Sequence, residues 1–181
     1  MQKISPFARA AATALFPVFV LSGCGAWQSV ANGTANAFHA VFYKHVENVD
    51  VDVSARDALN PDDAGRATSV VVRIYQLKDR KLFDTASYED LLKQDRKVLG
   101  TGTETSMSGV VNPGAALTFS QPIQDDMKYV AVAAFFRQPE NPDSWKFVVP
   151  VKKLDADAPL RLRLGDRKID QVNGDDLAAK S

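Results

Sequence analysis

From Val49 onward, short runs of alternating apolar and polar side chains dominate the sequence, a pattern typical of half-buried β-strands. Over residues 49–54 three valines alternate with Asp50, Asp52 and Ser54, so one face is expected to be buried and the other wet. Residues 69–77 form the strongest run, with β-branched residues on both faces. Residues 160–164 alternate leucine with arginine. Each run predicts a strand.

Four further strands are predicted at about residues 103–111, 116–123, 129–138 and 145–153, and Ile169 with Val172 can add a last edge strand. The run at 129–138 is apolar on both faces, so we expect it to be central and covered on both sides. Turn residues at 112–114 and 139–142 separate the runs. This regular spacing predicts an all-β fold with minor α, namely an antiparallel two-sheet β-sandwich. We assign it to residues 48–173 and expect disorder over residues 174–181.

Two helical segments are predicted. The first interrupts the strands at about residues 80–95, where Ser87 followed three residues later by Asp90 resembles a capping box. Its buried side is expected to consist of Leu82, Phe83, Tyr88, Leu91 and Leu92. The second is a possible short helix over residues 37–47, where apolar side chains recur at steps of three and four.

A long polar loop, residues 56–68, separates the first two strands. It is rich in side-chain oxygens, from Asp57, Asn60, Asp62 and Asp63. These could in principle hold calcium, but Pro61 lies between the possible ligands and no glutamate closes the loop. The pattern favours a solvated loop, with a protein-binding loop as the other interpretation.

The first 23 residues have the composition of a secretory leader. Lys3 and Arg9 are the only charges before Cys24, and the uncharged run Ala10–Leu21 is shorter than the ~20 residues that a membrane-crossing helix needs. Leu21-Ser22-Gly23-Cys24 matches a bacterial lipobox at all four positions. We therefore interpret residues 1–23 as a lipoprotein signal peptide. An ordinary signal peptide that happens to run into a cysteine is the alternative.

The lipobox predicts a lipid anchor at the start of the mature chain. Cys24 is expected to carry covalent diacylglycerol and an N-acyl lipid such as palmitate, and residues 24–36 are small and polar enough to form a tether. Gly25, rather than an aspartate, follows the cysteine. By the sorting rule for such lipoproteins we expect the inner leaflet of the outer membrane, with the domain facing the periplasm.

Charge and cysteine content narrow the function classes. The chain has 22 Lys+Arg and 22 Asp+Glu, and two of the bases lie in the leader, so the mature chain is slightly acidic. This balance argues against nucleic acid as a partner. Cys24 is the only cysteine, so no disulfide can form within the mature chain and the fold must be held by its core.

The sequence offers little chemistry for catalysis or metal binding. His39 and His45 are six residues apart, so on a helix they point about 120° from each other and cannot share a metal. No Gly-x-Ser-x-Gly motif occurs, and Asp50 and Asp52 share a strand face that we expect to be wet. Aromatic residues could line a ligand pocket, although packing is the favoured interpretation: Phe135, Phe136, Trp145 and Phe147. We therefore expect that the protein is not an enzyme, that it binds no metal, and that it has no cofactor beyond the lipid.

Several segments resemble the type VI secretion lipoprotein family called TssJ, VasD or SciN. They are residues 59–66 and 69–78, Phe83, residues 88–92, Leu99-Gly100, Asn112-Pro113-Gly114, residues 129–137 and Ser144-Trp145-Lys146. Two positions depart mildly from the family pattern. Lys146 stands where the family usually has arginine, and Ala67-Thr68 where it tends to have proline. Together with the lipobox, the resemblance covers about residues 24–153.

The resemblance implies a transthyretin-like β-sandwich with a short helical addition. It further implies an outer-membrane lipoprotein that anchors the type VI secretion membrane complex by binding the periplasmic C-terminal domain of the inner-membrane TssM (IcmF-like) protein, which partners TssL. In that family the loop between the first two strands makes the contact, which here points to Asn60, Asp62, Asp63 and Arg66. A periplasmic lipoprotein that holds a small ligand or glycan in its sandwich is the alternative, and an envelope enzyme is a third interpretation.

Overall fold

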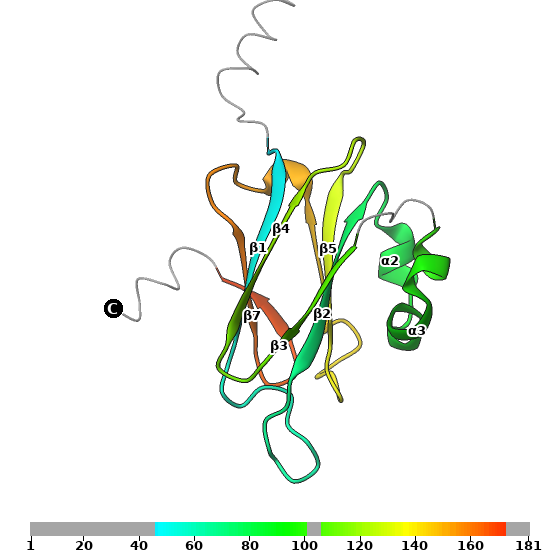
Figure 1. Ribbon diagram of the computed structural model, residues 1–181. Coiled ribbons are helices and arrows are strands. Elements are labelled where there is room, and N and C mark those ends of the chain that lie inside the picture. The colour runs from blue at the N-terminus through cyan, green and yellow to red at the C-terminus, as the bar shows by residue number, and fades with distance from the viewer. Residues whose placement is uncertain (1–45, 101–105, 173–181) are drawn as a thin grey trace, which may run out of the picture. The chain divides into compact units, whose positions relative to one another are not determined.

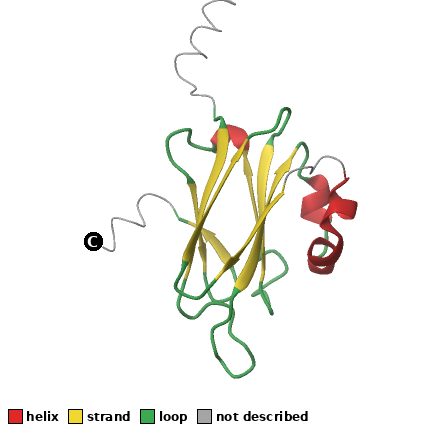
Figure 2. Cartoon of the chain, viewed as in Figure 1, coloured by secondary structure: helices red, strands yellow, loops and turns green. Residues whose placement is uncertain are grey.

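The computed structural model describes residues 46–100 and 106–172 (Figure 1). Its strands are β1 (Asn48–Ala55), β2 (Val70–Leu77), β3 (Ser106–Val111), β4 (Ala116–Pro122), β5 (Tyr129–Phe135), β6 (Lys146–Pro150), β7 (Leu160–Leu164) and β8 (Ile169–Gln171). The helices are α2 (Lys81–Thr85), α3 (Tyr88–Leu99) and the 3-10 turn η2 (Val151–Lys153). Two layers of strands pack together, and α2 and α3 lie outside one of them (Figure 2).

The two layers are four-stranded sheets with the strand orders β4-β1-β7-β8 and β3-β2-β5-β6. This arrangement confirms the predicted sandwich. One pairing departs from the antiparallel expectation, because β1 and β7 run parallel, with Val51 opposite Leu160 and Val53 opposite Leu162. The reason is the crossover after β6: β6 ends at the end of the sandwich at which β1 begins, and residues 151–159 cross to the other sheet there, so β7 starts at that end too.

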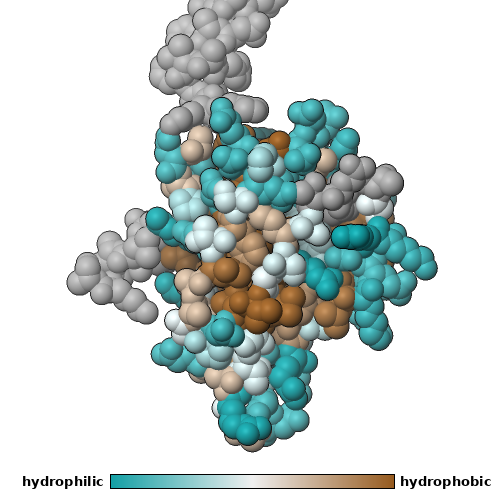
Figure 3. All heavy atoms as spheres, in the orientation of Figure 1, coloured by the Kyte–Doolittle hydropathy of each residue, from teal (hydrophilic) through white to brown (hydrophobic). Residues whose placement is uncertain are grey.

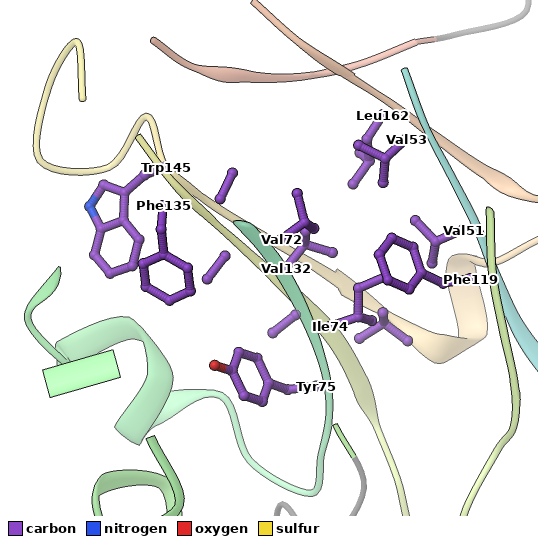
Figure 4. Packing of buried hydrophobic residues seen from close by; sticks show 14 of the residues in the cluster. Val51, Val53, Val72, Ile74, Tyr75, Phe119, Val132, Phe135, Trp145 and Leu162 are labelled. Atoms are coloured by element: carbon purple, nitrogen blue, oxygen red, sulfur yellow. The ribbon is translucent and has the colours of Figure 1, made fainter. Parts of the chain in front are cut away.

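The core lies between the two sheets and follows the predicted alternation. Val51 and Val53 of β1 are fully buried, as are Val72 and Ile74 of β2. Figure 4 shows these side chains meeting Phe119, Val132 and Leu162 between the layers. Burying one such side chain stabilises a fold by about 1.5–3 kcal/mol, so in a chain with no possible disulfide this core holds the domain together.

The β2–β5 sheet has a second apolar face, on the side away from the core. Tyr75, Phe135 and Trp145 point there, toward α2 and α3 (Figure 4). Ala131 and Ala133 of β5 lie between them on the same face and are fully buried. The prediction that β5 is central and covered on both faces is therefore confirmed.

The helical addition consists of two helices and extends further than predicted, to Leu99. The capping box is confirmed: the Asp90 N–H donates to Ser87 Oγ at 3.1 Å, and the Ser87 N–H donates to the Asp90 carboxylate at 3.3 Å. Phe83 and Leu91 are buried, but Leu82 and Leu92 are exposed, contrary to prediction. Adjacent residues lie about 100° apart around a helix, so each leucine turns away when its neighbour faces the sheet.

Several predicted boundaries shift. Strand β5 ends at Phe135 rather than 138, and residues 151–153 form η2 rather than the end of a strand. The edge strand β8 is present. Val46 and Glu47 are not helical, while residues 37–45 lie outside the described part, as do the leader, Cys24, His39, His45, residues 101–105 and residues 173–181. No helix in the described part is long and apolar enough to cross a membrane.

The two sheets approach each other closely on the side of the sandwich formed by the edge strands β3 and β4. A Cβ atom on Gly109 would lie only 2.4 Å from Leu117 Cδ2 and 3.0 Å from the Phe119 ring, so any larger residue would have to displace these side chains. Val110 of β3 remains exposed, and apolar residues gather near the middle of this face, whereas hydrophilic residues cover the loop at its lower end (Figure 3).

Candidate protein-binding loop

The loop between β1 and β2, residues 56–68, lies at the end of the sandwich opposite to the start of β1 (Figure 1). We call it the β1–β2 loop. Its base is fixed to the fold by backbone hydrogen bonds: the Arg56 N–H donates to the Leu164 carbonyl at 3.0 Å, and the Asn60 N–H donates to the Asp166 carbonyl at 2.7 Å. Leu59 is fully buried. The loop is therefore attached to the sandwich along part of its length.

Asn60 lies inside the loop rather than on its surface, with only 3% of the residue exposed. Its Nδ2 donates to Thr68 Oγ1 at 2.8 Å and to the Ser69 carbonyl at 2.9 Å, and its Oδ1 accepts from the Arg137 N–H at 2.7 Å. Its backbone is left-handed, with φ of 47°, a conformation that asparagine tolerates better than most residues. The structure thus gives Asn60 an internal role instead of the predicted surface contact.

Asp62 organises the tip of the loop. Its Oδ1 accepts from the backbone N–H groups of Ala64 and Arg66, each at 2.9 Å, and its Oδ2 accepts from Arg66 Nε at 2.9 Å. The backbone N–H of Arg66 and then its side chain lower the pKa of Asp62. Gly65, with φ of +75°, supplies the left-handed residue of this turn.

Asp63 and Arg66 are the predicted residues that face solvent. Their side chains are 84% and 80% exposed, respectively. Asp63 lies 3.5 Å from Arg137 Nη2, whose side chain is half exposed. Exposed ion pairs of this kind contribute about 0–1 kcal/mol to stability, so these charges are free to serve recognition instead.

The side chains considered for calcium do not converge on one point. Asn60 and Asp62 are occupied by the hydrogen bonds above, Asp63 points to Arg137, and Asp57 Oδ1 lies close to Gly114. Within residues 46–100 and 106–172, no group of three or more His, Cys, Asp or Glu is placed to hold a metal. On the wet face of β1, Asp50 and Asp52 accept hydrogen bonds from Ser120 and Thr118 of β4, at 2.5 and 2.7 Å.

The aromatic residues near Trp145 form packing rather than a pocket. The Tyr88 ring lies 4.9 Å from the Trp145 ring and 5.5 Å from the Phe135 ring, both edge-on. Trp145 Nε1 donates to the Pro142 carbonyl at 2.6 Å, and Phe136 is fully buried. These contacts fill the space between sheet and helices, as the favoured interpretation of this cluster predicts.

Lys146 has a structural role that the sequence pattern does not reveal. Its Nζ donates to the carbonyls of Phe83, Asp84 and Ala86, at 3.0, 3.1 and 2.5 Å. These carbonyls belong to the C-terminal end of α2, where no intrahelical partner exists. Burial lowers the pKa of Lys146. The one indication of this role in the sequence is that Lys146 directly follows Trp145, which is buried.

A second set of side chains whose role the sequence pattern does not reveal joins α3 to the sheet. Arg73 of β2 donates to the Leu91 carbonyl at 2.8 Å and to Asp95 at 3.1 Å, and the Tyr75 hydroxyl donates to the same carboxylate at 3.1 Å. Burial raises the pKa of Tyr75. The signal was Arg73 itself, a charged residue within the apolar run 69–77.

An open polar groove borders the β1–β2 loop. Its lining carries charges of both signs, from Arg56, Asp57, Glu140, Arg163 and Arg167 among others, and Trp145 is not part of it. The alternative of a small-ligand site in the sandwich calls for an apolar cavity near Trp145, and this charged groove is not such a cavity. The groove instead extends the charged surface of the loop end.

One family description matches most of the described chain. It reads "Type VI secretion lipoprotein, VasD, EvfM, TssJ, VC_A0113" and matches residues 47–167. A comparison with curated proteins gave no match.

Solved structures give consistent matches. A chain in the structure "T6SS protein TssM C-terminal domain (869-1107) from EAEC" is 29% identical, with a TM-score of 0.64 over 71% of this chain and 99% of that one. A chain in "Type VI membrane complex" is 31% identical, with a TM-score of 0.67 over the same shares. The lipoprotein TssJ1 from Pseudomonas aeruginosa has the same fold at 23% identity, with a TM-score of 0.61 over 70% of this chain and 95% of TssJ1.

Proposed function

Because this chain belongs to the type VI secretion lipoprotein family of VasD, EvfM and TssJ, we propose that it anchors the type VI secretion membrane complex at the outer membrane. It does so by binding the periplasmic C-terminal domain of TssM, the IcmF-like inner-membrane protein that works with TssL. Its role is structural rather than catalytic. The β1–β2 loop, braced from within and charged on its outside, is the observation that carries this proposal.

The solved structures support TssM as the partner. One similar chain belongs to a structure that is named for residues 869-1107 of TssM. The match covers 99% of that chain with only 71% of the 181 residues here. That chain is therefore far shorter than TssM residues 869-1107. A small β-sandwich similar to this one therefore accompanies the TssM domain in that structure. The other match belongs to a type VI membrane complex.

The loop fits a protein partner better than a small ligand. Asp63 and Arg66 extend from the tip, while Asp62 keeps the tip in shape and Asn60 holds its base. Exposed charges around an interface mainly raise the association rate and select the partner. We assign Asp62, Asp63 and Arg66 to the partner-facing tip, and Asn60 to its support.

The proposed anchor is the lipid on Cys24, which lies outside the described residues. Several acyl chains, at ~0.8 kcal/mol per buried CH₂, would hold the protein at the membrane essentially permanently. Gly25 after the cysteine supports the inner leaflet of the outer membrane, with the domain in the periplasm.

A pull-down from envelope extracts tests the partner. In the variant, Gly/Ser residues replace only the tip, residues 61–67, because Leu59, Asn60 and Thr68 belong to the fold. The matched control carries Lys152→Ala and Lys153→Ala in η2, at the opposite end of the sandwich. We expect the wild-type chain and the control to recover TssM and the tip variant to lose it, with an unchanged unfolding transition. Full recovery by the tip variant would contradict this loop as the contact.

A further inference from the structure

Asn60 connects two segments that are far apart in the sequence. Its amide nitrogen holds the far side of the β1–β2 loop through Thr68 and Ser69, while its carbonyl oxygen holds the backbone of Arg137, just after β5. Thr68 Oγ1 in turn donates to the backbone carbonyl of Asn60 at 2.5 Å, which closes the loop on itself. One buried side chain therefore fixes the relative position of both segments.

The same connection places a second exposed guanidinium beside the loop. Arg137 Nη2 lies 3.5 Å from the Asp63 carboxylate, and the Arg137 side chain is 50% exposed. Asp63 and Arg66 lie on the loop, whereas Arg137 comes from a different part of the chain. Three exposed charges from two segments thus meet on one surface.

We propose that Asn60 joins the β1–β2 loop and the segment after β5 into one preformed binding surface, to which Arg137 contributes a partner contact alongside Asp63 and Arg66. This inference rests on the proposed function and extends it to a second segment. Asn60 acts as a positioning residue, because it is buried and cannot reach the partner itself.

The physical argument is one of population. A loop that must first adopt its binding conformation binds more weakly, by the fraction of time that it spends in that conformation. Here backbone bonds at Leu59, Asn60 and Asp62, together with the Asn60 side chain, hold one conformation in the free protein. Without the side chain, residues 61–67 keep the Asp62 turn but lose their fixed relation to Arg137.

The first experiment measures loop order and partner binding on the full chain purified in detergent, with the TssM periplasmic domain as the probe. Asn60→Gly keeps the left-handed backbone accessible but removes the side chain. Thr68→Val removes only the hydroxyl, and Thr68→Ser is its matched control. We expect Asn60→Gly and Thr68→Val to speed hydrogen exchange of the loop amides and to slow association with TssM about tenfold, and Thr68→Ser to behave as wild type.

A purely structural role predicts a different result. Asn60→Gly and Thr68→Val would then lower the unfolding temperature, while the association rate of the folded protein and the exchange of the loop amides stayed as in the wild type. That outcome would overturn the proposal.

The second experiment is a charge swap between Asp63 and Arg137. We expect Asp63→Arg and Arg137→Asp each to weaken TssM binding at least tenfold, and the double variant to stay weak, because the partner no longer meets matching charges. Recovery of binding in the double variant, or wild-type binding by Arg137→Asp, would show that the two residues serve only each other and would overturn the assignment of Arg137. If the wild-type chain itself fails to bind TssM, the proposed function falls, and loop exchange in Asn60→Gly still tests the positioning role separately.

Discussion

At the scale of residues, a few buried polar side chains hold the loops and helices to the sheets. Gln76 resembles Asn60 in this respect: it is buried, its Nε2 donates to the Pro122 carbonyl at 2.9 Å, and its Oε1 accepts from the Gln124 N–H at 2.8 Å. Removing such a side chain leaves its partners unsatisfied, at a cost of about 1–3 kcal/mol.

Lys146 offers the clearest test at this scale. We expect Lys146→Met to lower the free energy of unfolding by about 1–3 kcal/mol, because the three carbonyls at the end of α2 lose their charged donor. Urea unfolding followed by tryptophan fluorescence measures this, since Trp145 packs beside the lysine. Lys146→Arg is the matched control, because a guanidinium keeps the positive charge and several donors. Equal stability of the methionine variant and the wild type would refute the role of Lys146.

The alternating runs of the sequence identify the core residues well. The valines of β1 and the leucines of β7 are buried as predicted. The role of Asn60 was not predictable in the same way. In a polar loop its side chain looks like any solvated amide, and its burial depends on Arg137, 77 residues away in the sequence. Such long-range hydrogen bonds leave no periodic trace, so they appear only once the strands are assembled.

At the scale of elements, α2 and α3 act as a cover for the outer face of the β2–β5 sheet. Their joint is Ala86, whose extended backbone, with ψ of 137°, ends α2 before Ser87 begins α3. The sequence indicates the start of α3 through the capping box, but it does not indicate the break, because Leu82 and Phe83 fit the same helical spacing as the residues of α3. The parallel pairing of β1 and β7 was not predictable either, because the alternation of apolar and polar residues does not indicate in which direction neighbouring strands run.

The capping box gives a prediction for this cover. We expect Ser87→Ala to destabilise the domain by about 1 kcal/mol, because the Asp90 N–H loses its acceptor at the start of α3. Ser87→Thr, which also caps helices, should stay within a few tenths of a kcal/mol of the wild type. Urea midpoints for the three proteins decide the matter, and an alanine variant as stable as the wild type would contradict it.

At the scale of the whole molecule, the start of β1 and the charged β1–β2 loop lie at opposite ends of the described domain. The chain enters β1 at one end, and the β1–β2 loop with its exposed charges lies at the other (Figure 1). This arrangement suits a protein held on one side and bound on the other.

If Cys24 carries the proposed lipid anchor, replacing its thiol should change the location of the protein in the cell. We expect Cys24→Ser to remove the protein from the outer-membrane fraction and to abolish secretion, while the domain stays folded, because its described core contains no cysteine. Sucrose-gradient fractionation with immunoblotting measures the location, and mass spectrometry of the mature wild type measures the acyl chains. A serine variant that still sediments with the outer membrane and supports secretion would refute the anchor.

The position of β1 also has a mechanical consequence. A pull exerted between Glu47 and the β1–β2 loop runs along the eight residues of β1, which are already extended at ~3.3 Å per residue. Such a tension lengthens the strand very little. Because it acts along the strand, it loads the hydrogen bonds to β4 and β7 together instead of opening them one after another. β1 would therefore transmit load through the sandwich as a stiff link.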